Sequence, residues 1–134
     1  MRHRAVALLV AALVAGGCTS VQRAGSPPSS CTTNPDLVGT WRSYRLSQAG
    51  PSWMTIALRC DCSSRSVAQL LFMRYTEEGY YRVEDGTIVF TRPSSETTWP
   101  FAVANDRMIL TEAPAEQYSY VRVSSARCPG ESVR

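Results

Sequence analysis

From Leu37 onward the chain alternates short apolar runs with turn signals, and this pattern constrains the fold more than any other feature of the sequence. The runs are rich in β-branched, aromatic and aliphatic residues, as strands are, and none has the apolar period of an amphipathic helix. Asp85-Gly86 separates two of them and is a strong hairpin signal, because both residues accept positive φ angles. Strands are predicted at 40–47, 53–60, 67–76, 80–84, 87–92, 97–104, 108–112 and 117–124, although 70–73 also fits a buried helical turn.

These runs predict an all-β fold. They recur about once every eleven residues, which suits an antiparallel meander that closes on itself and so leaves no exposed sheet edge. Alternation supports strands with one buried face, because Met54, Ile56 and Leu58 share one side of their run. We predict a single eight-stranded antiparallel up-and-down barrel over 37–128, followed by a C-terminal tail at 129–134. A two-sheet β-sandwich is the alternative.

The amino-terminal segment predicts export and lipidation. A positively charged start at 1–4 precedes an apolar run at 5–15, and small residues then lead to Cys18. The apolar run is too short for a bilayer-spanning helix, which needs about 20 residues. The segment resembles the lipobox leader of bacterial lipoproteins, and 1–17 is therefore predicted to be a lipoprotein signal peptide removed before Cys18. The alternative is an ordinary secretory leader in which Cys18 is incidental.

The resemblance to lipoproteins implies where the protein lies. Acyl chains such as palmitate on Cys18 would make the lipid bilayer its first partner. The Ser, Pro, Thr and Gly content of the next residues predicts that 18–36 is the lipidated cysteine with a flexible tether. No aspartate follows Cys18, so the resemblance implies the outer membrane facing the periplasm in a Gram-negative cell. In a cell with one membrane it implies the outer face of that membrane.

Composition excludes several function classes. The only histidine, His3, lies in the predicted leader, so the mature chain has neither a Ser-His or Cys-His nucleophile pair nor the usual histidine-containing zinc site. We expect no enzyme activity, no cofactor and no metal. The chain has 14 basic and 11 acidic residues, and its arginines are scattered singly, which argues against a nucleic-acid partner.

Four cysteines besides Cys18 predict disulfides. In an even-stranded meander, Cys31, Cys60, Cys62 and Cys128 fall at one rim of the barrel, and three pairings are open. A bridge from Cys60 to Cys62 would be strained, because a single residue separates them. We therefore expect each of these two to pair with one outer cysteine, with the choice between them open. A thiolate metal site at 60–62 is the alternative, but exported cysteines usually oxidise.

Three segments resemble one protein family. Leu37-Val38-Gly39-Thr40-Trp41 is similar to the Gly-x-Trp that opens the first strand of lipocalins and of small bacterial lipocalin-like lipoproteins, proteins of calycin type. The segment 79–88 resembles the central hairpin of those bacterial domains, and 118–122 resembles their last strand. The resemblance implies a structural signature of Gly39, Trp41 and Arg122, in which the arginine packs on the tryptophan as a cation–π pair.

The predicted function follows from the barrel. A ligand pocket lined by aromatic residues is one expectation, and a core that those residues simply fill is the other. The pocket candidates are Tyr44, Tyr75, Tyr80, Tyr81 and Trp99. We expect non-enzymatic binding of a small apolar ligand, or support of the envelope. The alternative is a protein-interaction module with an envelope protein as partner, such as an inhibitor of an envelope-degrading enzyme. A connected apolar cavity would favour the ligand, whereas a filled barrel with a projecting loop would favour the protein partner.

Overall fold

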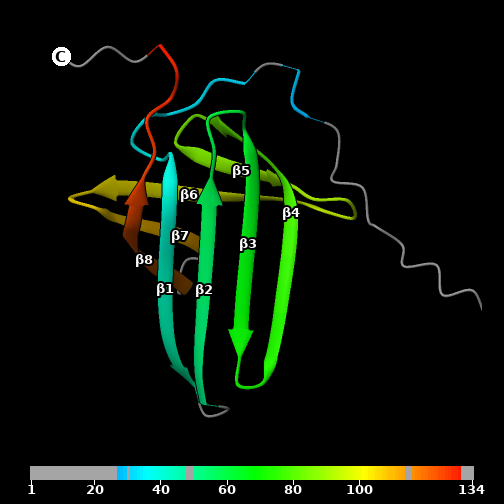
Figure 1. Cartoon of the computed structure of the whole chain (residues 1–134), viewed down its shortest axis with the longest axis vertical. Coiled ribbons are helices and arrows are strands. Elements are labelled where there is room, and N and C mark those ends of the chain that lie inside the picture. Colours follow the sequence, from blue (N-terminus) through cyan, green and yellow to red (C-terminus); the bar gives the residue numbers. More distant parts are fainter. Residues whose placement is uncertain (1–26, 30, 48–49, 114–115, 131–134) are drawn as a thin grey trace, which may run out of the picture.

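The computed structural model describes residues 27–29, 31–47, 50–113 and 116–130, and all regular structure within them is β (Figure 1). Consecutive strands pair antiparallel and β8 returns to β1, which closes a barrel in the order β1-β2-β3-β4-β5-β6-β7-β8. The predicted eight-stranded up-and-down barrel is therefore confirmed. The strands are β1 Gly39–Ser47, β2 Gly50–Leu58, β3 Ser63–Leu70, β4 Met73–Glu84, β5 Thr87–Thr91, β6 Glu96–Ala104, β7 Arg107–Ala113 and β8 Glu116–Ser125.

The predicted leader at 1–17, Cys18 and most of the predicted tether lie outside the described residues, as does most of the predicted C-terminal tail. Within the described part of the chain, no helix has the length and apolarity needed to cross a membrane.

Two hairpin turns form where the sequence predicts them. Asp85 and Gly86 join β4 to β5 with φ angles of 46° and 75°, and Asn105 and Asp106 join β6 to β7 with φ angles of 50° and 59°. Positive φ at both central residues is the pattern of two-residue hairpins, because it matches the twist of the flanking strands.

The boundary between the third and fourth predicted strands is wrong. The run predicted at 67–76 crosses a tight turn at Leu71-Phe72, and the run predicted at 80–84 is only the second half of β4. The helical turn considered for 70–73 is wrong as well. Leu71 takes a φ angle of 51° although it is neither Gly, Asn nor Asp, so this turn carries no sequence signal. The β3–β4 hairpin is therefore longer than the predicted one, because its strands pair from Ser63 and Tyr80 to Leu70 and Met73.

The hydrophobic core fills the closed part of the barrel. Trp41 and Tyr81 are among its largest members and lie on β1 and β4. Buried side chains from β2, β5, β7 and β8 pack against them, with aromatic and aliphatic residues from opposite sides in contact. The rest of this cluster consists of Leu37, Ile56, Leu58, Cys62, Ile88, Phe90, Met108, Leu110 and Tyr120.

Four strands continue past the closed barrel. β1 pairs with β8 only over Gly39–Arg42, and β4 pairs with β5 only over Tyr80–Glu84. Among the described residues, the rest of β1 therefore has a strand partner on one side only, as does the first half of β4. Figure 1 shows β1–β4 as long strands that extend below the crossing strands β5–β8. This extension, with the β1–β2 and β3–β4 turns at its tip, is named the open end.

Disulfides pin the opposite end, named the disulfide end. Cys31 bonds to Cys62 and Cys60 bonds to Cys128, with Cα–Cα distances of 5.7 and 5.4 Å. Each inner cysteine thus pairs with one outer cysteine, and the structure resolves the choice that the sequence leaves open. The Tyr81 hydroxyl donates a 2.8 Å hydrogen bond to the Arg59 carbonyl and ties the connection between β2 and β3 to β4.

Candidate functional site: a cavity at the open end

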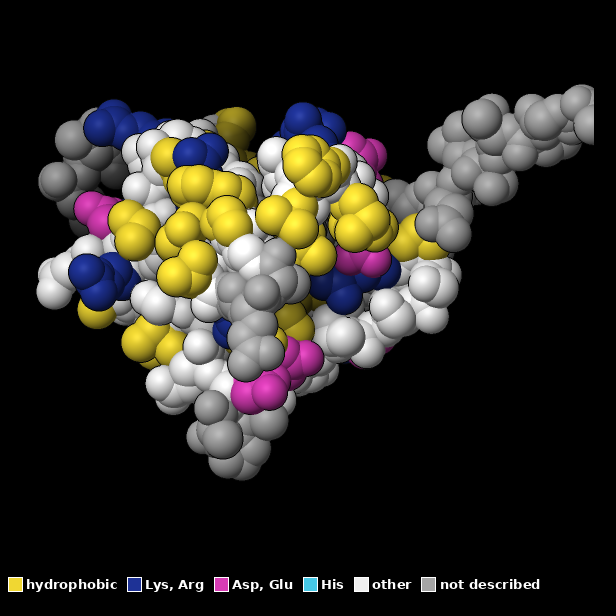
Figure 2. Space-filling view, turned by 90° about the horizontal axis from the view of Figure 1, so that it is seen from below, with side chains coloured by type: hydrophobic (Ala, Val, Ile, Leu, Met, Phe, Trp, Pro, Cys, Tyr) yellow, Lys and Arg dark blue, Asp and Glu magenta, His cyan; other side chains and the backbone are white. Residues whose placement is uncertain are grey.

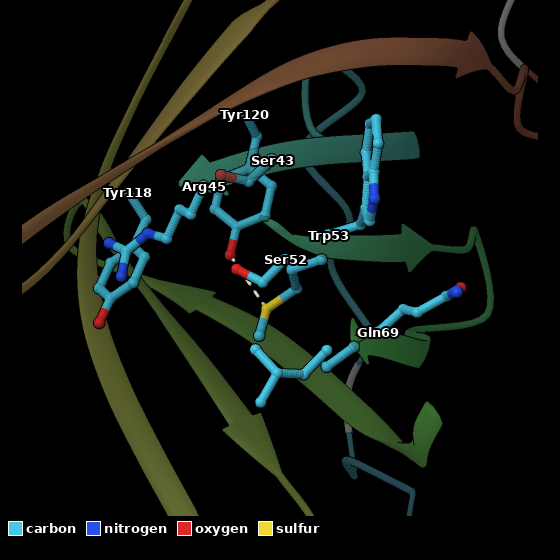
Figure 3. A pocket seen from close by; sticks show the side chains of 10 residues that line it. Ser43, Arg45, Ser52, Trp53, Gln69, Tyr118 and Tyr120 are labelled. Atoms are coloured by element: carbon cyan, nitrogen blue, oxygen red, sulfur yellow. Dashed lines mark hydrogen bonds between the residues drawn. The ribbon is translucent and has the colours of Figure 1, made fainter. Parts of the chain in front are cut away.

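A cavity of about 290 Å³ lies where the inner face of the open end meets β8 (Figure 3). Most of its lining follows strand alternation, because the inner side chains of β1 continue the parity of the buried Trp41 and those of β2 continue the parity of the buried Ile56. Trp53 and Gln69 also contact the cavity although they have the opposite parity. Apolar atoms dominate its surface. The lining residues are Ser43, Arg45, Ser52, Trp53, Met54, Ala68, Gln69, Leu70, Tyr118 and Tyr120.

Tyr120 forms the inner wall of the cavity, next to the core. Its side chain is buried, and its hydroxyl lies 3.2 Å from the Met54 sulfur. Burial raises the pKa of Tyr120 to about 12, while the positive charge of Arg45 lowers it slightly. The phenol is therefore neutral at physiological pH, and this wall presents a ring, a thioether and an uncharged hydroxyl.

One cationic group stands beside these apolar walls. The Arg45 guanidinium carbon lies 3.5 Å from the centre of the Tyr118 ring, within cation–π range (Figure 3). Trp99 stacks on Tyr118 with the ring centres 6.0 Å apart and the ring planes 5° from parallel. The Tyr118 hydroxyl donates to Glu112, whose hydrogen bond is the largest cause of the raised pKa of that phenol. The Tyr118 ring is thus fixed from two sides and holds Arg45 in place.

Five ion pairs form among the described residues, and Arg45 takes part in none of them. Its charge is therefore available to a ligand at the cavity. The site combines an apolar interior with one cation, which suits an apolar molecule with one polar or anionic end.

The five predicted pocket aromatics do not line this cavity. Tyr44 points to the outer face of β1 and packs on Trp53 with ring centres 4.6 Å apart, and Tyr75 is largely exposed on β4. Tyr80 and Tyr81 line a separate groove of about 370 Å³, but the Tyr81 ring belongs to the core and Trp99 backs Tyr118. For Tyr81, the alternative prediction that these aromatic residues fill the core is therefore the correct one.

The true lining carries a sequence signal that aromatic content alone does not show. Trp41 is the buried residue of the opening strand, and counting in twos from it reaches Ser43 and Arg45 and leaves Tyr44 outside. The same count from Ile56 reaches Met54 and Ser52. Tyr118 and Tyr120 obey the same rule on β8, but their distance from β1 in the sequence hides their proximity.

The signature residues lie away from the cavity and serve the fold. Arg122 lies over Trp41, with its guanidinium carbon 4.2 Å from the centre of the indole, which is the contact that the family resemblance implies. The Trp41 indole N–H donates a 2.8 Å hydrogen bond to the Leu37 carbonyl. Gly39 has a φ of 143°, and a Cβ there would meet the Ser124 carbonyl oxygen at 2.5 Å, so a larger residue would not fit.

Metal ligands do not gather in the described residues: no group of three or more His, Cys, Asp or Glu side chains among them is arranged to hold an ion. The four cysteines of the disulfide end are all oxidised, so none of them offers a thiolate.

Comparison with known proteins identifies a structural neighbour. The crystal structure of the lipoprotein YedD from Klebsiella pneumoniae superposes with a TM-score of 0.54, covering 72% of this chain and 79% of that one, at 13% sequence identity. No known family profile matches the sequence. No curated protein sequence matches it either. The likeness to YedD therefore shows a shared fold.

Proposed function

We propose that this chain is an exported, lipid-anchored protein of the bacterial envelope that binds a small apolar ligand at its open end. The leader and Cys18 support export and anchoring, and the two disulfides fit an oxidising compartment. The structural neighbour is itself described as a lipoprotein. Anchoring would use acyl chains such as palmitate on Cys18 and would place the barrel on an outer membrane facing the periplasm or, in a cell with one membrane, on its outer face.

The cavity is the observation that carries the ligand proposal. Its volume of about 290 Å³ is just below the usual range of ligand pockets, about 300 to 1,000 Å³, and therefore suits a small ligand. Met54, Leu70 and the ring of Tyr120 offer apolar contact, and Arg45 offers a charge to the polar end of the ligand. We propose binding rather than catalysis, because the only histidine of the sequence lies in the predicted leader.

A substitution that fills the cavity tests this proposal. Ala68 lines the cavity from β3, so Ala68→Phe would place a ring in the ligand volume. The matched control is Ala102→Phe, which adds the same ring at an exposed position of β6. The probe is N-phenyl-1-naphthylamine, an uncharged apolar dye that fluoresces in apolar surroundings.

The parent protein and Ala102→Phe are expected to bind the dye with one site, and Ala68→Phe is expected to bind it at least tenfold more weakly. Equal binding by Ala68→Phe and the parent would contradict the proposal, and so would the absence of saturable binding by the parent.

A further inference from the structure

The open end carries a cluster of exposed apolar side chains, named the tip surface. Phe72 is fully exposed at 102% of its reference area and Leu46 is 78% exposed. Single exposed apolar residues are normal, but a contiguous group marks an interaction surface. Figure 2 looks at the molecule from the open end and shows apolar side chains gathered across this face. The tip surface consists of Tyr44, Leu46, Trp53, Leu71, Phe72, Met73 and Tyr75.

The two hairpins of the open end contribute to one continuous surface. A Cβ at Gly50 would lie 2.9 Å from a methyl carbon of Leu71, so the β3–β4 turn packs against the start of β2. Phe72, next to Leu71 in the β3–β4 turn, is the most exposed of these apolar side chains.

Aromatic and cationic residues stand at a defined height above the tip. Strand register places Tyr44, Trp53, Gln69 and Arg74 in one row across β1–β4. That row is about two residues from the β3–β4 turn, or roughly 7 Å at the rise of a strand. Arg42 lies in a row two residues farther along β1, at roughly 14 Å.

A groove of about 400 Å³ on the outer face is lined by both Arg42 and Arg74, together with Trp53 from the row of Arg74. Its lining is Arg42, Trp53, Thr55, Val67, Gln69 and Arg74. Neither Arg42 nor Arg74 pairs with a carboxylate of the described residues.

The acidic residues nearest on β4 are already neutralised. Glu77 lies 2.8 Å from Arg92, and Glu78 lies 3.6 Å from Arg65. Arg42 and Arg74 therefore give the outer face of the open end two cations without a carboxylate partner among the described residues, which are complementary to an anionic surface.

We propose that the tip surface docks the open end onto a bilayer that contains anionic lipids. Phe72 and Leu71 enter the boundary between headgroups and acyl chains, where interfacial groups insert about 5–10 Å deep. Trp53 and Tyr44, about two residues farther from the turn, then lie at headgroup level, where such rings concentrate. Arg74 and Arg42 contact lipid phosphates. A lipid surface accounts for the apolar tip and for the unpaired arginines together.

The proposed anchor is compatible with this docking. Cys31 is fixed at the disulfide end, and the eight residues of β3 span roughly 27 Å from that end to the tip. The residues between Cys18 and Cys31 reach at most about 45 Å when extended. One bilayer can therefore hold the acyl chains and receive the tip surface.

Vesicle flotation tests the proposal. The protein is the oxidised chain from residue 18 to 134 with Cys18→Ser, so that no acyl chain contributes to binding. It is mixed with vesicles of phosphatidylglycerol and phosphatidylethanolamine, and separately with vesicles of phosphatidylcholine. It is expected to float with the anionic vesicles, to float less at high salt, and to shift its tryptophan emission to shorter wavelength on binding.

Two variants and a control locate the contact. Phe72→Ser is expected to lower the partition coefficient at least tenfold. Arg74→Gln is expected to lower it about fivefold on anionic vesicles and to leave it unchanged on phosphatidylcholine. Val123→Thr replaces an exposed apolar residue of β8 outside the tip surface and is expected to bind like the parent.

Absence of flotation, or flotation that Phe72→Ser leaves unchanged, would overturn the proposal. Analytical ultracentrifugation of the same proteins covers the other occupants of the surface. A dimer that Phe72→Ser dissolves, without vesicle binding, would assign the tip surface to a second copy. Capture of a defined envelope protein through Phe72, again without vesicle binding, would assign the tip surface to a protein partner. Either result would overturn the proposal that the tip surface binds a bilayer.

Discussion

Arg122 holds three parts of the barrel together, so its replacement has a calculable cost. Its guanidinium lies over Trp41 and donates hydrogen bonds to the carbonyls of Val38 and Asp36, at 2.9 and 2.5 Å. Its Nε donates to Asp106 at 2.9 Å, and the arginine side chain is only 15% exposed. Arg122→Met keeps much of the packing and removes every one of these polar contacts.

The expected loss is about 3 kcal/mol. A cation–π contact contributes about 0.5–2 kcal/mol, and a charged hydrogen bond about 1.5 kcal/mol or more. The contacts share one side chain, so their sum is an upper bound, and the pair with the exposed Asp106 adds little. Arg122→Lys keeps the charge without the planar fork and is expected to lose about half as much.

Equilibrium unfolding in urea measures this loss. With an m-value of about 1.5 kcal/mol per molar, within the usual range of about 1–3, the midpoint of Arg122→Met should fall by roughly 2 M. Arg107→Met is the control, because Arg107 is exposed and takes part in none of the ion pairs of the described residues. The reasoning is refuted if Arg122→Met loses less than about 1 kcal/mol, or no more than Arg107→Met.

Two further predictions concern the disulfide end and the buried phenols. Replacing both cysteines of the Cys31–Cys62 bond should cost about 3–4 kcal/mol in urea unfolding, and replacing those of Cys60–Cys128 somewhat more, because that bond closes a span of 68 residues against 31. Equal costs would contradict an origin in chain entropy. Of the six tyrosines, Tyr81 and Tyr120 should ionise last in a spectrophotometric titration, because burial raises both pKa values to about 12. Their neutral forms stabilise the fold fully below about pH 10, the pKa of an unfolded tyrosine, and this contribution should fall as the pH rises towards 12. The prediction is refuted if the Tyr81→Phe, Tyr120→Phe double variant loses as much stability between about pH 10 and 12 as the parent protein does.

The overall architecture was predictable because two of its hairpin turns use residues with a physical preference for them. Asp85-Gly86 and Asn105-Asp106 tolerate positive φ, so both hairpins can be read from the sequence. The β3–β4 turn was not predictable in this way. Leu71 and Phe72 are apolar and lie inside an apolar run, and only tertiary structure holds Leu71 at positive φ.

That same missed turn is the most exposed apolar part of the described chain, which is informative about function. A local sequence that contradicts the expected turn chemistry often marks a position selected for something other than folding. Here Leu71 and Phe72 form the tip surface for which we propose a bilayer.

Part of the cavity lining could have been predicted from the sequence. Aromatic content pointed to Tyr44 and Tyr75, whereas the parity of Trp41 along β1 leads to Ser43 and Arg45. The contribution of Tyr118 from β8 depends on how far β1 and β8 stay paired. That length is set by three-dimensional packing, and no local pattern encodes it.

Native mass spectrometry of the protein extracted from its own envelope tests the central claim most directly, because one spectrum reports the acyl groups on Cys18, the oxidation of the other four cysteines and any small molecule carried in the cavity. We predict a mass that includes acyl chains and two disulfides, together with a bound apolar molecule that is lost from Ala68→Phe. An unmodified Cys18 would contradict the account. So would a parent protein without a bound molecule, or a bound molecule that Ala68→Phe retains.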